Sequence, residues 1–348
     1  MKRTFFAFLF LFLLLSCKKE EKYTLNDWQK ISENVAFKSV GDFVKLKSGK
    51  FNYNIPVSKL PFKKVMLLNA SLVGYFTELS LEDKIIGISS PEYVYSEKIH
   101  SLISEGKIQN IGNEQKYDIE KIIALKPDAV FTNYIPSFDN TYDLIRKNGI
   151  EIIFLDEYLE QNPLEKSKYL MVFGRLLGPE EASVVRFNEI QSSYDSLKAL
   201  AQKGQYKPVV LANEMYGNQW FLPGGKTNLA TLIADANAKY INAENSDSKA
   251  VPLSFEEVFV KSQNAEFWVN VGNHKIKKEL LQINPNYTKM NVYHHGKLYT
   301  VSGRDKGSAN DFFESGVVRS DLILKDYIKI FHPELLPDYN LTYLKPLK

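Results

Sequence analysis

A single apolar stripe along the segment 179–203 predicts the longest helix of the chain. Apolar side chains recur there every three or four residues, at Val184, Phe187, Ile190, Tyr194, Leu197 and Leu200. This is the spacing of one helix face. Pro179 and Gly204 mark its start and its end. At ~1.5 Å per residue the helix is roughly 37 Å long, which exceeds what a small domain needs to cross its own core. We predict a rigid rod between two similar halves; the alternative is a long surface helix of one domain.

Short apolar runs alternate with helical patterns on both sides of this rod. Before it, strands are expected at 65–69, 85–88, 129–132 and 150–155, and helices at 71–79, 95–104, 119–126, 142–147 and 164–177. After it, strands are expected at 209–212, 220–222, 267–271 and 297–301, and helices at 227–234, 256–261, 275–281 and 317–330. This alternation predicts parallel sheets that helices cover on both faces. Asp118 is expected to cap the helix that follows it.

The chain begins with a pattern typical of secretion. Lys2 and Arg3 precede an apolar run over 5–15, which is too short to span a bilayer. Ser16 and Cys17 follow, and the residues 14–17 resemble the lipobox of bacterial lipoproteins. This resemblance implies cleavage before Cys17, lipidation of its thiol and a membrane anchor at the periplasmic face, with surface exposure left open. The alternative is an ordinary signal peptide with a chance cysteine.

Composition limits the remaining function classes. The 348 residues are 44% hydrophobic and 24% charged, as in a folded soluble protein of two domains. The net charge of +3 falls to about +1 without the leader, so no nucleic-acid partner is expected. Cys17 is the single cysteine, so the mature chain can form no internal disulfide and has no thiol nucleophile in its folded part.

Two stretches carry a family resemblance. LEDKIIGISS at 81–90 is followed by IGNEQKYDIEKIIALKPDAVF at 111–131. The second stretch fills a family pattern with Gly112, Asp118, Glu120, Ile122, Leu125, Pro127 and Asp128. The chain thereby resembles the class III periplasmic substrate-binding proteins that serve importers of ferric siderophores, haem and cobalamin. The likeness runs over about 65–330, and the segment 302–337 resembles a subgroup from Bacteroidetes-type bacteria.

The resemblance implies an α/β fold with two Rossmann-like lobes, one long rigid helix between them and a ligand cleft between the lobes. The expected division is a lipoprotein signal peptide at 1–16, a tether and N-terminal extension at 17–63, an N-terminal lobe at 64–178, the interlobe helix at 179–203 and a C-terminal lobe at 204–348. It also implies a monomeric binding protein, not an enzyme, that needs no cofactor. Its partners would be a small ligand and the permease and ATPase subunits of an ABC importer.

Ligand-binding candidates follow from this fold, because ligands bind at the carboxyl ends of the strands. The candidates are Asn69, Ser71, Ser89, Ser90, Asn133, Tyr134, Tyr216, Trp220, Asn270 and Arg304. Tyrosine and tryptophan offer flat apolar area with a polar tip, and Arg304 could pair with an anionic group of the ligand. The alternative for Trp220 is a core or hinge aromatic.

Transporter docking in the family relies on one acidic residue in each lobe. Glu256 falls at the expected position of the second lobe, with Glu257 beside it. In the first lobe the expected position holds Gly74, and we expect Glu78 to substitute. Either acid could instead belong to a solvated helix face.

A ferric siderophore is the preferred ligand, with cobalamin or haem as alternatives. Haem would require an axial ligand such as Tyr134 or Tyr216. Related two-lobed proteins carry bare zinc or manganese on histidines, but only His294 and His295 are adjacent here, and on a strand they would point to opposite faces. No metal site is therefore predicted. The segment 224–227 lacks the glycine of a phosphate-binding loop, and no G-x-S-x-G is present, so an enzyme is the least favoured class.

Overall fold

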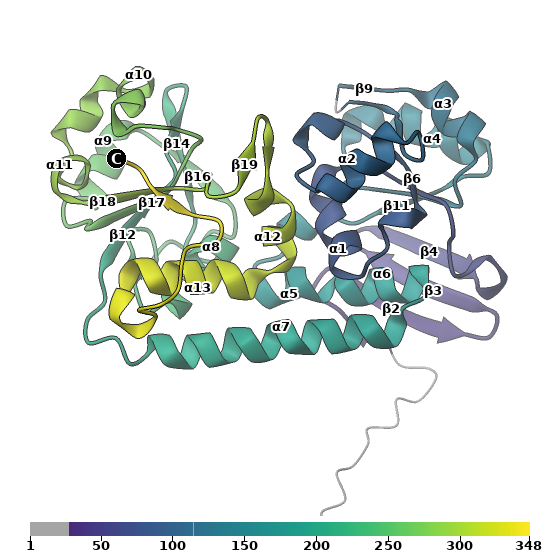
Figure 1. Cartoon of the computed structure of the whole chain (residues 1–348), viewed down its shortest axis with the longest axis horizontal. Coiled ribbons are helices and arrows are strands. Elements are labelled where there is room, and N and C mark those ends of the chain that lie inside the picture. Colours follow the sequence, from purple (N-terminus) through teal and green to yellow (C-terminus); the bar gives the residue numbers. More distant parts are fainter. Residues whose placement is uncertain (1–27, 114) are drawn as a thin grey trace, which may run out of the picture.

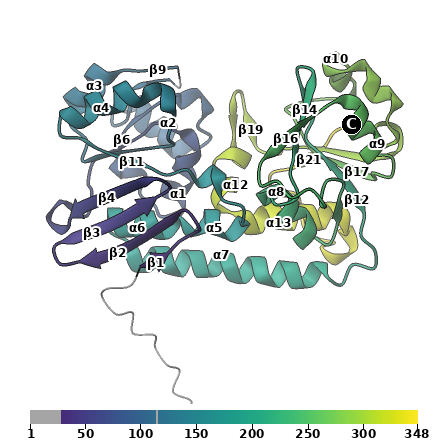
Figure 2. The same ribbon diagram turned by 180° about the vertical axis from the view of Figure 1, so that it is seen from behind.

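The computed structural model describes residues 28–113 and 115–348. The expected leader and the lipidation site Cys17 lie outside these residues. Figure 1 shows two lobes side by side above one long helix, and Figure 2 shows the same arrangement from behind.

A five-stranded parallel sheet forms the centre of the N-terminal lobe, in the order β11-β10-β5-β6-β7. Its strands are β5 (Val65–Leu67), β6 (Ile85–Ile88), β7 (Gln109–Asn110), β10 (Ala129–Thr132) and β11 (Glu151–Phe154). β5 and β10 are buried along their whole length, as expected where helices cover both faces. The parallel sheet predicted from the alternating pattern is therefore confirmed.

Six helices accompany this sheet. They are α1 (Val73–Glu78), α2 (Glu97–Ser104), α3 (Ile119–Leu125), α4 (Asp139–Lys147), α5 (Pro163–Lys168) and α6 (Leu170–Leu177). Asp118 caps α3 as predicted, since its carboxylate accepts a hydrogen bond of 3.0 Å from the Lys121 N–H. The prediction of one helix over 164–177 is wrong in one respect, because the chain breaks into α5 and α6 at Tyr169. The short strands β8 (Gly112–Asn113) and β9 (Lys116–Tyr117) form a hairpin before α3.

The C-terminal lobe repeats this plan with the order β15-β12-β17-β18-β21. Its strands are β12 (Val209–Ala212), β15 (Lys239–Tyr240), β17 (Phe267–Val271), β18 (Lys297–Thr300) and β21 (Lys345–Pro346). The first four are parallel, and β21 closes the edge as an antiparallel strand. A second sheet of β13 (Met215–Tyr216), β14 (Gln219–Pro223) and β16 (Ala250–Leu253) is antiparallel.

The helices of the C-terminal lobe differ from the predicted pattern in three places. They are α8 (Asn228–Asp235), α9 (Phe255–Lys261), α10 (Leu280–Ile283), α11 (Asn291–His295), α12 (Ser315–Val318) and α13 (Ser320–Phe331). The helix predicted over 317–330 is interrupted at Arg319, and the one over 275–281 forms only partly. His294 and His295 lie on a helix, so the expectation based on a strand was wrong for them. A hairpin of β19 (Asp305–Lys306) and β20 (Ala309–Asn310) precedes α12.

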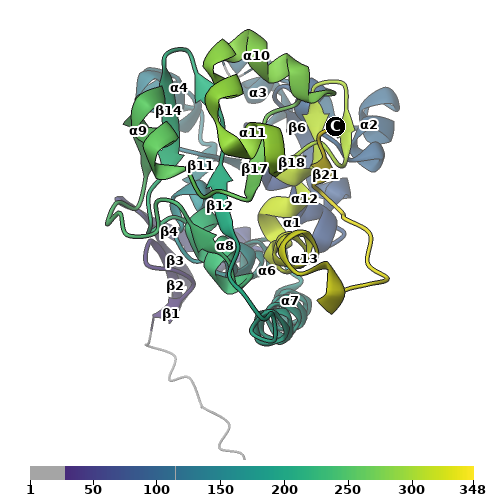
Figure 3. The same ribbon diagram turned by 90° about the vertical axis from the view of Figure 1, so that its left-hand side faces the viewer.

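The long helix α7 (Glu180–Ala201) confirms the predicted rod. Phe187 and Ile190 pack in the core of the N-terminal lobe, whereas Tyr194, Leu197 and Ala201 pack in the core of the C-terminal lobe. Burial of each large side chain contributes about 1.5–3 kcal/mol, so both ends are firmly held. Seen along its axis in Figure 3, α7 lies beneath α13. One stiff element therefore fixes the distance between the lobes.

An antiparallel sheet precedes the N-terminal lobe, within the segment expected to be an N-terminal extension. Its strands are β1 (Gln29–Lys30), β2 (Val35–Val40), β3 (Phe43–Ser48) and β4 (Phe51–Pro56). Phe37, Leu46, Tyr53 and Ile55 belong to the core of the N-terminal lobe. The sheet therefore packs one face on the lobe and leaves the other toward solvent.

Candidate functional site

The short helix α12 separates two cavities at the boundary between the lobes. Gly316 and Val317 line the larger cavity, whereas Ser315 and the neighbouring Arg319 line the smaller one. Figure 1 shows α12 and β19 between the lobes. The segment 302–319 therefore occupies the middle of the expected cleft and leaves room on either side of it.

The larger cavity has a volume of about 650 Å³, which is within the usual range for small-molecule sites. Most of its surface is apolar or aromatic. Tyr158 and Leu159 come from the N-terminal lobe, and Phe312, Phe313 and Tyr327 come from the C-terminal lobe. The Phe313 side chain is 58% exposed and lines the cavity beside Phe312. Both lobes therefore offer flat apolar surface to the same space.

Two asparagines mark the carboxyl ends of the central strands in this cavity. Asn213 follows β12 and Asn270 lies in β17, and the two strands are paired neighbours. Both asparagines have positive φ values, of 59° and 53°, a conformation that asparagine tolerates better than most residues. The Asn270 side-chain oxygen accepts a hydrogen bond of 2.8 Å from the Tyr327 hydroxyl. The predicted candidate Asn270 therefore lies at the cavity wall.

Lys166 brings a positive charge into the same cavity. Lys166 lies in α5 of the N-terminal lobe, lines the cavity and is partly buried. Burial lowers the pKa of its ammonium group, although the carboxylates of Glu157 and Glu160 act in the opposite direction. Among the described residues, Lys166 makes no ion pair within 4.0 Å. It can therefore pair with an anionic group that enters the cavity.

Glu160 is fixed in the cavity wall by hydrogen bonds from the N-terminal sheet. Its carboxylate accepts bonds of 2.6 Å from the Ser32 hydroxyl, 3.2 Å from the Asn34 amide and 2.7 Å from the Tyr169 hydroxyl. The extension thus orders the loop 157–161 that faces the C-terminal lobe.

Three predicted candidates meet in a polar cluster around Glu157 rather than in a cavity. The Glu157 carboxylate accepts hydrogen bonds of 2.7 Å from Ser71 and 2.9 Å from Asn133, and Asn133 bonds in turn to Asn69. Burial raises the pKa of Glu157 despite these donors. The cluster joins the carboxyl ends of neighbouring strands and supports the loop that carries Tyr158.

The other predicted candidates lie at different places. Ser89 and Ser90 are buried, and the Ser89 hydroxyl donates to the Leu68 carbonyl. Tyr134 packs against Phe51 of the N-terminal sheet, with the Lys50 ammonium 4.0 Å from its ring centre.

Two candidates of the C-terminal lobe also lie away from the cavity. Tyr216 is 82% exposed on the β13–β14 hairpin. Trp220 is fully buried, is stacked on Trp268 and donates a hydrogen bond to the Ala212 carbonyl. It is therefore a core aromatic, the alternative given for it above.

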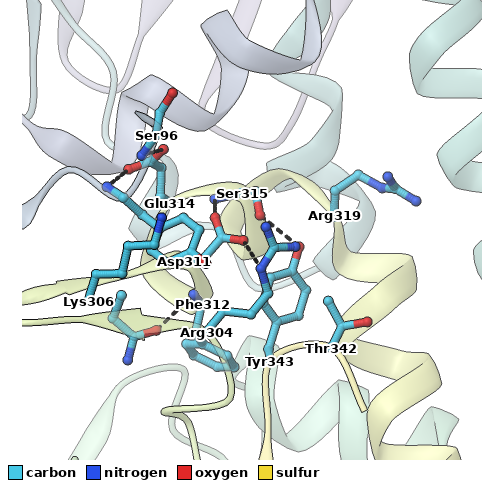
Figure 4. Close-up of polar contacts among 12 residues, drawn as sticks. Ser96, Arg304, Lys306, Asp311, Phe312, Glu314, Ser315, Arg319, Thr342 and Tyr343 are labelled. Carbon is cyan, nitrogen blue, oxygen red and sulfur yellow. Dashed lines mark hydrogen bonds and ion pairs between the residues drawn. The ribbon is translucent and has the colours of Figure 1, made fainter. Parts of the chain in front are cut away.

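The smaller cavity, of about 490 Å³, is charged (Figure 4). Arg304 contacts Asp311 at 3.0 Å, and its guanidinium lies 5.3 Å from the ring centre of Tyr95. Glu314 accepts hydrogen bonds of 2.5 and 3.1 Å from the backbone N–H groups of Tyr95 and Ser96, which belong to the opposite lobe. Burial raises the pKa of Glu314 to about 7. This cavity therefore contains a direct polar connection between the lobes.

The first-lobe docking candidate Glu78 is already paired within the chain. Its side chain is 13% exposed, and it lies 2.6 Å from Arg186 of α7 and 3.8 Å from Arg319. Arg319 in turn holds Asp321 through two bonds of 2.9 Å. Two cations of the same chain thus compensate its charge, which leaves Glu78 less available to a partner than an unpaired acid.

The surroundings of Gly74 explain why the glutamate expected from the family pattern is absent at this position. A side chain there would begin 2.3 Å from the Glu314 carbonyl oxygen and 3.2 Å from a methyl group of Val318. α1 and α12 therefore pack in direct contact, and a glutamate cannot fit between them.

In the second lobe the structure distinguishes the two acidic candidates. Glu257 forms a capping box with Ser254, since its carboxylate accepts bonds of 2.7 Å from the Ser254 N–H and hydroxyl groups. Glu256 is exposed on the first turn of α9. Glu256 is thus the acid that is available to a partner.

The sequence interpretation missed the segment 157–166 and the pair Phe312 and Phe313. The segment 156–160 directly follows the strand predicted at 150–155, and Asn213 directly follows the one at 209–212, so the strand-end rule applied to Asn69 would have found both. No comparable signal exists for Phe312 and Phe313, because the hairpin before α12 brings them to the cavity.

The described part of the chain contains neither a metal-binding cluster nor a membrane-spanning helix. Within residues 28–113 and 115–348, no group of three or more His, Cys, Asp or Glu side chains is arranged to hold a metal ion. In the same ranges no helix combines the length and the apolar character that a membrane crossing requires.

The sequence pattern of the periplasmic binding protein family matches residues 65–304. This chain belongs to that family. Members of the family are solute-binding proteins, so this protein is a binding protein and not an enzyme, as the sequence predicts. Its two-lobed α/β fold is the fold of that class.

Individual relatives are distant. An uncharacterized lipoprotein of Methanocaldococcus jannaschii is 21% identical over 296 residues, which cover 82% of this chain and 69% of the relative. The structure of Helicobacter pylori CeuE with Ni(II) bound has a TM-score of 0.63 at 18% identity and covers 85% of this chain and 91% of its own. A periplasmic haem-binding protein of Pseudomonas aeruginosa has a TM-score of 0.58 at 16% identity, with 82% and 95% covered. At such identities these structures establish the fold alone.

Proposed function

We propose that this protein is the lipid-anchored solute-binding component of an ABC importer and that it captures a ferric siderophore or a similar anionic iron complex. The observation that carries the proposal is the cavity of about 650 Å³ between the lobes, where aromatic side chains surround an ammonium group without an ion-pair partner among the described residues.

The lining favours a ligand with a flat apolar body and an anionic edge. Tyr158, Phe313 and Phe312 offer ring faces, on which planar groups stack. Lys166 is partly withdrawn from water, and a charge in such surroundings interacts more strongly with an opposite charge than it would in bulk solvent. Lys166 would repel a bare metal cation, and the Glu160 carboxylate in the same wall is already bound by three hydrogen-bond donors. These features support an anionic chelate over free zinc or manganese.

Haem is the second candidate, because the cavity wall contains two tyrosines and a solved structure of similar fold binds haem. A tyrosine ligates ferric haem as the phenolate. Burial, together with the nearby Asp156 and Glu157 carboxylates, raises the pKa of Tyr158 and so opposes this form. Tyr327 already donates its hydroxyl proton to Asn270. A siderophore places no such demand on the protein, so we rank it first.

Calorimetric titration of the mature chain from Cys17, made with serine at that position, tests the proposal. Ferric catecholate and hydroxamate siderophores, haem, cobalamin and zinc are titrated in turn into the wild-type sequence and into Lys166→Met, with Lys226→Met as the matched control. We expect saturable binding of an anionic iron complex that weakens about tenfold or more in Lys166→Met and is unchanged in the control. Binding of zinc alone, or equal affinity in all three proteins, contradicts the assignment.

The delivery step rests on Glu256 and the anchor on Cys17. Glu256 is exposed and the neighbouring Glu257 caps α9, so Glu256 is the docking residue that we propose for the second lobe. The anchor is supported by the lipobox-like residues 14–17 and by the relative named as a lipoprotein.

A further inference from the structure

Positive charge is concentrated in the N-terminal sheet and the connection that follows it. Residues 28–64 contain eight lysines and two acidic residues, a net charge of +6. Residues 65–348 contain 31 basic and 36 acidic residues, a net charge of −5. The near-neutral total thus conceals two parts of opposite sign, and such asymmetry indicates a surface with an anionic partner.

The strand register places lysines together on the outer face of this sheet. Lys38 lies opposite Lys45, and Lys47 lies opposite Ala36. Opposite residues in an antiparallel pair share one face, so these three lysines point to the same side. Buried Phe37 and Leu46 occupy the other face, which packs on the lobe. In Figure 2 the sheet lies at the front, with no other element drawn over it.

No acidic residue shares this outer face. Its remaining positions, which follow from the same register, are Lys30, Val40, Phe43, Asn52, Asn54 and Pro56. Within the described chain, Lys30 pairs with Glu33 of the adjoining turn, whereas Lys38, Lys45 and Lys47 have no ion pair. Lysines placed opposite each other repel, a cost that an anionic partner would remove. Solvated protein surfaces normally intersperse the two signs.

Aromatic side chains accompany the lysines. The ammonium groups of Lys38 and Lys47 lie 5.0 and 4.5 Å from the ring centre of Trp28. Phe43 is exposed at the end of the same face. Tryptophan and phenylalanine beside lysine are the combination that proteins use at the boundary between lipid and water.

We infer that the outer face of the N-terminal sheet binds the anionic phospholipid headgroups of the membrane that carries the anchor. The inference rests on the proposed lipidation of Cys17. Ten residues separate Cys17 from Trp28, and at about 3.3–3.6 Å per residue they span at most roughly 40 Å. Trp28 directly precedes β1 and lies beside Lys38 and Lys47, so the tether joins the described protein at this face. Lysines near an anionic membrane surface are attracted to it within a Debye length.

The two remaining tryptophans make the contact measurable in the intact protein. Trp220 and Trp268 have no exposed surface, so quenchers in the lipid can reach only Trp28. The full-length protein, processed by the cell and purified with its anchor, is reconstituted into vesicles with brominated acyl chains. The vesicles contain either phosphatidylcholine alone or a mixture rich in phosphatidylglycerol. The triple variant Lys38→Gln, Lys45→Gln, Lys47→Gln is compared with Lys59→Gln, Lys63→Gln, Lys64→Gln, which removes the same charge from outside the strands.

We expect Trp28 to be quenched in the phosphatidylglycerol vesicles, and the quenching to fall about twofold or more in phosphatidylcholine, in about 1 M salt and in the strand variant. The control variant should behave as the wild type. Quenching that is equal in both vesicle types, or that survives in the strand variant, overturns the inference, and absent quenching points to an acidic protein as the partner. Co-sedimentation with phosphatidylcholine vesicles reports the anchor separately. Protein that fails to co-sediment refutes the anchor, while salt-sensitive quenching by phosphatidylglycerol vesicles still supports the lysine face.

Discussion

The Glu314 carboxyl group connects the two lobes, and the pH dependence of the free energy of unfolding measures its contribution. It reaches from the C-terminal lobe to the backbone N–H groups of Tyr95 and Ser96, at 2.5 and 3.1 Å. We consider the substitution Glu314→Gln, which removes the ionisable group and keeps the size of the side chain. The two N–H groups bond to different carboxylate oxygens, so the single oxygen of glutamine can accept from only one of them. That lost bond is the same at every pH, so the pH dependence of the difference between the two proteins reports the charge.

The sign follows from the raised pKa. Burial raises the pKa of Glu314 from 4.5 to about 7, and the Asp311 carboxylate adds to the shift. Between these two pH values the folded protein binds a proton that the unfolded chain releases, so folding is favoured at acidic pH. The contribution is fully present below pH 4.5 and is lost as pH rises through 7. At ~1.4 kcal/mol per unit, the shift corresponds to at most about 3 kcal/mol.

Urea unfolding of wild type and Glu314→Gln at pH 5 and pH 8 measures this term. Other buried acids, such as Glu157 and Asp326, also have raised pKa values and affect both proteins equally. The informative quantity is therefore the difference between the two proteins. We expect the stability of the variant relative to wild type to rise by about 1–3 kcal/mol between pH 5 and pH 8. The exposed substitution Glu181→Gln should show no such change.

A difference that is the same at both pH values would refute this reasoning, because it would mean that Glu314 titrates alike in the folded and unfolded chains. If the stability of the variant relative to wild type instead falls between pH 5 and pH 8, the carboxylate is the form that the folded protein favours. In that case the backbone donors and Arg304 would outweigh the cost of burial.

Three further outcomes are expected. Gly74→Glu should lower the free energy of unfolding by about 1–3 kcal/mol or more, measured by denaturant unfolding, because the new side chain meets the Glu314 carbonyl; unchanged stability would contradict the contact. Glu256→Ala should leave ligand affinity intact and impair uptake in cells, and lost ligand binding in this variant would refute its assignment. Glu257→Ala should instead lower the free energy of unfolding by about 1 kcal/mol, because it removes part of the cap of α9. Cys17→Ser should abolish acylation in metabolic labelling with a fatty acid, and labelled protein would disprove the lipobox.

The local pattern of the chain predicted the central strands, the long helix and the parallel sheets, and the family resemblance supplied the two-lobed fold class. Alternating apolar runs predicted the parallel strands, and the stripe from Val184 to Leu200 predicted α7. These features can be predicted from the sequence because they follow from burial of one face or of a whole strand. The breaks at Tyr169 and Arg319 cannot be predicted in this way, since apolar periodicity continues through both.

At Arg319 the cause of the break lies elsewhere in the chain. Its guanidinium holds Asp321 two residues away and lies near Glu78 of the other lobe. A helix that continued through Arg319 would place these groups differently, so the tertiary contact decides against the local preference.

The candidate site was predictable only as far as it depends on strand ends. Asn270 was identified because it ends a strand, and Asn213 and Tyr158 obey the same rule. Asn69, Ser71 and Asn133 also obey it, yet they bond to Glu157 rather than line the cavity. A strand end places a residue at the correct edge of the sheet, but its hydrogen-bond partners decide whether it faces a ligand.

The two docking positions show how far a family pattern can be transferred to a single chain. Glu256 is available for the docking role that we propose because α9 exposes it, and nothing among the described residues pairs with it. At Gly74 the pattern fails because the same surface of α1 is covered by the segment that ends in α12. That segment also divides the cleft, holds Glu314 against the opposite lobe and supplies Phe312 and Phe313 to the larger cavity. The segment 302–319 therefore both covers α1 at Gly74 and fills the middle of the cleft, between lobes that α7 holds at a fixed distance.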